Sequence, residues 1–359
     1  MRAAVLGIVN CLALVTVCTS DVTAQRDSLN AAFARQARPW STPRTPDGVP
    51  DLQGVWMNNT VTPFERPKEL AGRELLTDDE LAMLKQRAAR LFDGSGDTAP
   101  GDELFLALLA NPEEHKTARG TGDYNLAWQK EDLVFDRRTS QIFDPPDGRL
   151  PPLTQEGQRR LAVTAQRRQQ PVVPENLAPL SRCISHGGPR IGFLHARNNS
   201  YYQIVQARGV VVILAEMIHE ARMIPTDGRP HLSPAIRAWT GDSRGRWENG
   251  TLIIETTNFS PEINFYGAGE HLRLTERLTR IDDDTIQYEV TVDDPATWTR
   301  PWKAMVPWKR SDKTIYEFAC HEENRALKGI LAGARAAEKS TDVKKATVPA
   351  SRNPSASTA

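Results

Sequence analysis

Residues 199 to 320 contain successive runs rich in β-branched and aromatic residues, and turn-forming residues separate these runs. Several runs alternate between apolar and polar side chains, which is the pattern of a strand with one buried face. Short strands at this spacing are typical of an antiparallel sheet, sandwich or barrel. We expect strands within 199–207, 209–225, 245–259, 270–281, 284–294, 302–310 and 313–320.

The clearest local prediction is a β-hairpin over residues 273–292, with its turn at Asp282 to Asp284. Side chains on one face of this hairpin are mostly apolar, so that face is expected to point into the core. The expected core residues are Leu272, Leu274, Leu278, Ile286, Tyr288, Val290 and Val292.

The first half of the chain predicts helices. Residues 76–92 form an amphipathic pattern with Thr77 as N-cap, and residues 153–170 form a second helix opened by Thr154. Residues 51–56 read as an additional strand. Strands outnumber helices, so the expected fold class is β-rich α+β, an antiparallel β-barrel or curved sheet with a helical covering region.

The N-terminus has the layout of a secretory signal peptide, because Arg2 precedes an apolar segment and a small-residue site at 22–24. The apolar segment is too short to span a bilayer comfortably. A lipid anchor at Cys18 is the alternative, but the residues before that cysteine are not the small ones expected. We predict a signal peptide (1–24), an arm (25–50), a first strand with a helical covering region (51–182), a barrel core (183–334) and a disordered tail (335–359).

Signal-peptide cleavage would leave two cysteines, Cys183 and Cys320. In an oxidising compartment they predict one disulfide, which would bring His186 and His321 close together. Two separate buried thiols and a Cys/His metal site are the alternatives, and the exported context favours the disulfide. We therefore expect no metal and no cofactor.

Several longer motifs resemble a family of exported, uncharacterised bacterial proteins. The motifs "PDGVPDLQGVW", "IFDPPDGRLPPLT", "EMIHEARMIPTDGRPH" and "GDSRGRWENGTLIIETTNF" occur in the order found in that family, and the resemblance runs from about residue 39 to 335. It implies export and a single architecture, but no activity. More loosely, the Gly54-Val55-Trp56 opening is similar to the Gly-x-Trp opening of lipocalin-type barrels, which implies a lipocalin-like barrel.

The candidate catalytic residues are His219, Glu216 and Glu276. If residues 209–224 form one strand, His219 is the only polar side chain on an apolar face, near the carboxylates of Glu216 and Glu276. Burial and a neighbouring acid shift the pKa of a histidine in opposite directions, which suits acid–base catalysis. Two alternatives stay open: a metal site with His231 and a carboxylate, and a hydrogen-bonded structural histidine.

Glu276 interrupts an apolar face, and a buried carboxylate needs a partner such as Arg222, Arg246 or His219. It is either a structural ion pair or a functional acid in a cavity. Further candidate ligand-binding residues are Arg222, Arg244, Trp247, His231, His186 and His321. Arginine would bind an anionic group, and tryptophan would stack on a ring.

The chain has 45 basic and 45 acidic residues, and it lacks a nucleotide-binding glycine loop, a nucleophile elbow and a basic stripe for nucleic acid. The expected function is binding of a small apolar or aromatic molecule in a barrel, with conversion by a cofactor-independent lyase, isomerase or hydrolase. The alternatives are a non-catalytic carrier and a structural or interaction module with a filled barrel. We expect a periplasmic or secreted protein that does not insert stably into a membrane.

Overall fold

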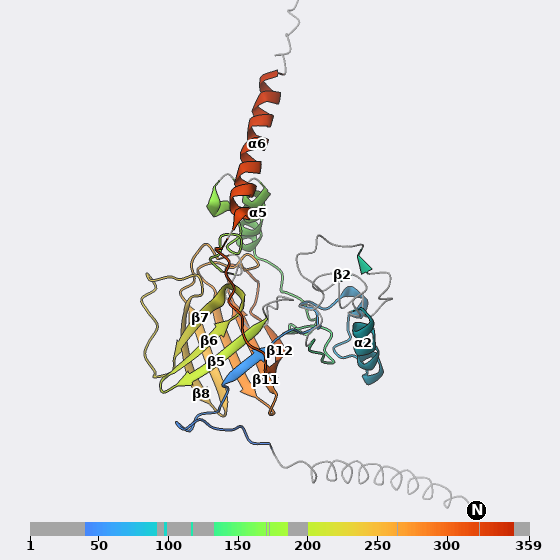
Figure 1. Ribbon diagram of the computed structural model, residues 1–359, viewed down its shortest axis with the longest axis vertical. Helices are drawn as coiled ribbons and strands as arrows, with labels where there is room; N and C mark the ends of the chain where they lie inside the picture. Colours follow the sequence, from blue (N-terminus) through green and yellow to red (C-terminus); the bar gives the residue numbers. More distant parts are fainter. Residues whose placement is uncertain are drawn as a thin grey trace, which may run out of the picture. The chain divides into compact units, whose positions relative to one another are not determined.

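The computed structural model describes residues 40–91, 97–98, 116–117, 133–169, 171, 173–185, 200–263, 265–322 and 324–347 (Figure 1). The predicted signal peptide and most of the predicted arm lie outside these residues. All the described helices and strands belong to the compact unit that begins at Pro43. No helix in this described part of the chain is long and apolar enough to cross a bilayer.

The main feature is an antiparallel sheet that curls into a nearly closed barrel, as the sequence predicts. Its strands follow the order β7-β6-β5-β1-β12-β11-β10-β9-β8, so β7 and β8 are the two ends of the sheet. The strands are β1 (Gly54–Met57), β5 (Tyr201–Ala207), β6 (Val210–Ala215), β7 (Glu220–Pro225), β8 (Asp242–Glu248), β9 (Thr251–Thr257), β10 (Arg273–Arg280), β11 (Thr285–Asp293) and β12 (Trp302–Ser311). The short strand β4 (Ile142–Asp144) also pairs with β12, and β2 (Asp97–Thr98) pairs with β3 (Lys116–Thr117).

The interior of the barrel is lined by alternate residues of each strand. In the β10–β11 hairpin, Leu278 lies opposite Tyr288 and Leu274 lies opposite Val292, and all the predicted core residues of this hairpin are buried. The ring of Trp308 stacks between those of Tyr202 and Tyr288, with centroid distances of 4.5 and 5.1 Å. This aromatic stack fills part of the interior with the barrel's own side chains.

Two of the three α-helices in the described part of the chain begin and end close to the predicted positions. They are α2 (Asp78–Leu91) and α5 (Gln155–Gln169), and α6 (Arg325–Thr347) follows the barrel. In α2, the Glu80 amide donates to Thr77 Oγ1 and the Thr77 amide donates to Glu80 Oε2, which forms a capping box. Short 3-10 segments cover Lys68–Leu70, Pro174–Asn176 and Met217–His219.

Two segments after strand β12 differ from the prediction. Residues 313–320 are not a strand; the Tyr316 amide in this segment donates a hydrogen bond to Glu216 Oε1 instead of joining a sheet. Residues from 335 onward, predicted to be disordered, continue helix α6 up to Thr347. The alanines, leucines and lysines of α6 are good helix formers, so local propensity favours a helix although most of its described side chains are exposed.

The predicted disulfide between Cys183 and Cys320 is formed. It joins residues 137 positions apart, and the chain between them contains β5 to β12. The barrel strands outside this covalent loop are β1 and β4.

Candidate functional site

The segment predicted as one strand over 209–224 is a hairpin. Strand β6 ends at Ala215, and β7 begins at Glu220 after a tight turn. His219 lies in this turn with a φ of 54°, and its side chain is exposed. The prediction that His219 stands alone on an apolar strand face is therefore wrong, because the strand ends before it.

Glu216 precedes the same turn, and it is buried. Its side-chain Oε1 accepts the hydrogen bond from the Tyr316 amide at 3.1 Å. This contact ties the β6–β7 turn to the segment that leads into the disulfide, which gives Glu216 a structural role in the fold.

Glu276 lies inside the barrel, as its place on the apolar face of β10 predicts, with 1% of its surface exposed. Arg222 from β7 donates to both of its carboxylate oxygens, and the Tyr288 hydroxyl donates to Oε1 at 2.7 Å. Three side-chain donors therefore surround this buried carboxylate and replace the water that it loses on burial. Arg222 is therefore the partner of Glu276, and neither group is left without a counter-charge.

The same arginine connects the two ends of the sheet. Arg222 Nε donates to Ser243 Oγ on β8 at 2.9 Å, and Nη2 donates to Thr256 Oγ1 on β9 at 2.6 Å. No backbone ladder is found between β7 and β8, so the side-chain network of Arg222 helps to close the barrel at this seam. Burial lowers the pKa of Arg222, but Glu276 raises it more, and the net pKa lies above the usual value.

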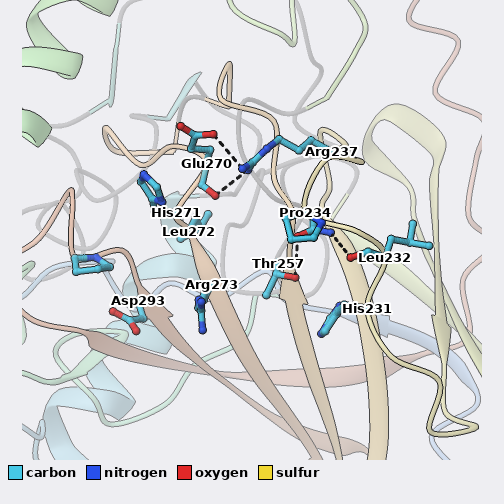
Figure 2. A pocket seen from close by; sticks show the side chains of 12 residues that line it. His231, Leu232, Pro234, Arg237, Thr257, Glu270, His271, Leu272, Arg273 and Asp293 are labelled. Carbon is cyan, nitrogen blue, oxygen red and sulfur yellow. Dashed lines mark hydrogen bonds and ion pairs between the residues drawn. The ribbon is translucent and has the colours of Figure 1, made fainter.

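A pocket of about 530 Å³ lies at one rim of the barrel (Figure 2). At this rim, Thr256, Leu274 and Val292 are buried and face the interior. Neighbouring residues of a strand point to opposite faces, so the pocket-lining residue next to each of these three faces outward. The pocket is thus on the outer side of the wall, under the loop that joins β7 to β8. Its lining is His231, Leu232, Pro234, Arg237, Thr257, Asn258, Glu270, His271, Leu272, Arg273, Asp293 and Pro295.

His231 in this pocket is held by a carboxylate. Its Nδ1 lies 2.8 Å from Asp242 Oδ2, and Arg244 Nη1 donates to Asp242 Oδ1 at 2.6 Å. The Leu232 amide adds a third donor to Asp242. Burial raises the pKa of Asp242, but the Leu232 amide, His231 and Arg244 together lower it by more, so its pKa lies below the usual value.

Of the remaining predicted site residues, only Arg244 belongs to the network around His231 in the described part of the chain. Trp247 packs against the main core from the other end of β8, and Arg244 is engaged by Asp242 and the Pro230 carbonyl. His321 is exposed next to the disulfide, and His186 lies outside the described residues. Within the described residues, no three histidine, cysteine or acidic side chains gather as a metal ion would require.

Sequence reasoning missed most of the rim pocket. Arg237, Glu270, His271, Arg273 and Asp293 come from strand ends and loops that carry no recognisable motif. The available signal is their position directly beside predicted strands, where loops gather at the end of a barrel. That signal indicates a region, but it does not indicate which side chains face one another.

Comparisons with known proteins give no match. No protein-family model matches the sequence, and neither a curated protein nor a solved structure is similar to it. These comparisons therefore transfer no role to the nearly closed nine-strand barrel.

Proposed function

We propose that this chain binds a small aromatic or apolar molecule in the rim pocket and converts it by acid–base chemistry without a cofactor. The observation that carries the proposal is His231, which lines the pocket and is held by Asp242 at 2.8 Å. The proposed acid–base residue is His231 in place of His219, which lies in an exposed turn. The pocket's volume of about 530 Å³ suits a molecule of this size.

The contact with Asp242 prepares His231 for proton transfer. The lowered pKa keeps Asp242 ionised at neutral pH, and an ionised carboxylate can only accept a hydrogen bond. Nδ1 of His231 therefore carries the proton, which leaves Nε2 of the neutral ring as the basic atom. A lyase, an isomerase and a hydrolase all need such a group, and none of them needs a redox cofactor.

We also propose that the protein acts in the periplasm or outside the cell, as a member of the exported family that its motifs resemble. The signal-type N-terminus and the Cys183–Cys320 disulfide support this location. A lipocalin-like carrier would use the same pocket without chemistry.

Turnover by variants tests the catalytic proposal. Purified protein is incubated with a panel of small aromatic esters, lactones and β-hydroxy carbonyl compounds, and products are quantified by chromatography. His231→Asn is expected to lower turnover by about 100-fold or more, since positioned acid–base groups contribute at least that much. His219→Asn, which alters an exposed histidine, is expected to match the wild type.

Equal rates for the wild type and His231→Asn would contradict the catalytic role. Binding of an aromatic compound by the wild type, with no turnover of any compound, would favour the carrier.

A second candidate function is a structural or interaction module. It is favoured by the interior packing, where the Tyr202–Trp308–Tyr288 stack and the Arg222–Glu276 pair occupy space that a ligand would need. This module would show neither turnover nor binding of small aromatic compounds.

A further inference from the structure

Two opposite charges in the rim pocket, those of Arg273 and Asp293, form no ion pair among the described residues. Arg237, also in the pocket, donates to the Glu270 carbonyl and forms an ion pair with the Glu270 carboxylate at 3.1 Å. In contrast, neither Arg273 nor Asp293 forms a hydrogen bond through its side chain or an ion pair with another described residue, although both line the pocket. Among the residues that the structure describes, Arg273 and Asp293 thus leave a guanidinium and a carboxylate available in the pocket.

These two groups lie on neighbouring strands. Arg273 is the first residue of β10, and its Cα partner in the ladder is Asp293, the last residue of β11. Both side chains lie on the outer face of the sheet, because strand residues alternate between the two faces. Figure 2 shows the two side chains at the same side of the pocket, with His231 at the opposite side. A ligand bridging them would carry an anion and a cation a few bonds apart.

Apolar surface lies beside the charges. Leu232, Pro234 and Leu272 line the same pocket. His231 is bound to Asp242 on β8, and β9 lies between β8 and β10. The backbones of β8 and β10 are therefore two inter-strand spacings apart, roughly 10 Å in total. One ring or branched chain would fit across this distance.

We propose that the ligand is a zwitterionic α-amino acid with an aromatic or branched apolar side chain. Its carboxylate binds Arg273 in the two-pronged geometry that guanidinium favours, and its ammonium group binds Asp293. The side chain lies on the apolar wall toward His231. This inference rests on the proposed function, because it assumes that the rim pocket is the binding site.

Three probes separate the two charges in a calorimetric titration of the full chain. L-phenylalanine carries both charges, L-phenylalanine amide lacks the carboxylate, and N-acetyl-L-phenylalanine lacks the ammonium group. L-phenylalanine is expected to bind about tenfold more tightly than either derivative, since a charge-assisted contact in a partly buried site is worth about that factor.

Variants assign each charge to its residue. Arg273→Gln is expected to reduce the affinity for L-phenylalanine to that of the amide, and to leave the affinity for the amide unchanged. Asp293→Asn is expected to reduce it to that of the N-acetyl derivative. Arg277→Gln and Glu289→Gln are matched controls, because these two residues form the same kind of cross-strand pair on β10 and β11 and do not line the pocket.

Similar affinity for all three probes would overturn the zwitterion inference and leave the proposed aromatic binding in place. Equal losses in the control variants would also overturn it, since the effect would then come from general surface charge. Absence of binding by every probe, and by the neutral aromatic compounds tested above, would overturn the proposed function itself.

Discussion

The carboxylate of Glu276 is buried in the barrel, and three donor groups from Arg222 and Tyr288 compensate the loss of water around it. Burying a charge is tolerated only with such partners. When one partner is removed, the desolvation penalty of the remaining buried charge is no longer compensated. The pair is therefore important for stability as a pair, whichever function the pocket has.

Arg222→Met is expected to destabilise the protein by about 3–5 kcal/mol, because it leaves the Glu276 charge buried without its cation. The double variant Arg222→Met/Glu276→Leu is expected to recover much of this loss, since no buried charge remains. Urea unfolding measures both. Arg229→Met, which removes an exposed pair with Asp227, serves as a control with little expected effect. A double variant no more stable than the single one would contradict the argument.

Asp242 gives a prediction about pH. Its pKa is lowered in the folded state, so the unfolded chain binds protons more readily below about pH 4, the usual range for this group. The stability that Asp242 contributes is complete above that pH and is lost as the pH falls through the lowered pKa. Asp242→Asn is therefore expected to be less stable than the wild type at pH 7, with a difference that narrows in acid. Urea unfolding across this range would refute the prediction if the difference stayed constant.

At the scale of elements, the seam between β7 and β8 depends on the small size of Gly245. A Cβ atom at this position would lie 2.9 Å from Ile224 Cγ2 and 2.9 Å from Thr226 Cγ2. The missing side chain allows β7 to approach β8 although no ladder joins them.

Gly245→Ala is expected to destabilise the barrel by about 1–3 kcal/mol, because the added methyl group overpacks the seam. Gly329→Ala is the control: it lies in α6 with open space around it, so a helix-favouring alanine should stabilise by up to about 1 kcal/mol. Both values come from urea unfolding. A Gly245→Ala variant as stable as the wild type would show that the seam has room to adjust.

The predicted elements agree with the structure where side-chain pattern alone decides them. Alternation identified the β10–β11 hairpin and its inward face, and Thr77 marked the start of α2. The β6–β7 turn escaped prediction because Ile218 and His219 adopt φ values of 65° and 54°. A β-branched residue rarely takes that conformation. In addition, the sequence has no glycine, asparagine or proline there to mark a turn.

The candidate site was predictable only in part. The position of Glu276 on an apolar face predicted a buried partner, and Arg222 was among the candidates. The approach of His231 to Asp242 depends on the path of the loop over residues 226–241, which no periodicity determines. Long-range loop contacts of this kind are decided by tertiary packing rather than by local pattern.

At the scale of the whole molecule, the disulfide closes a loop of 137 positions in sequence. Removing it with Cys183→Ser/Cys320→Ser is expected to lower stability by up to about 5 kcal/mol, because the unfolded chain regains the entropy of a long open loop. Thermal unfolding with and without reductant measures the effect, and each single serine variant should match the double one. A wild-type melting temperature that reductant leaves unchanged would contradict the prediction.

Strand β1 comes from outside this covalent loop and lies between β5 and β12, with Val55 opposite both Gln203 and Ser311. The sheet is therefore built from two separate stretches of chain, and the stretch before the disulfide loop contributes β1, a strand of four residues, and the short strand β4. In a split protein, likewise, one piece of chain completes a sheet that another piece forms. A peptide carrying β1 and a partner carrying the remaining strands are expected to reassemble on mixing. Fused to two other proteins, these pieces would then report whether those proteins bind each other.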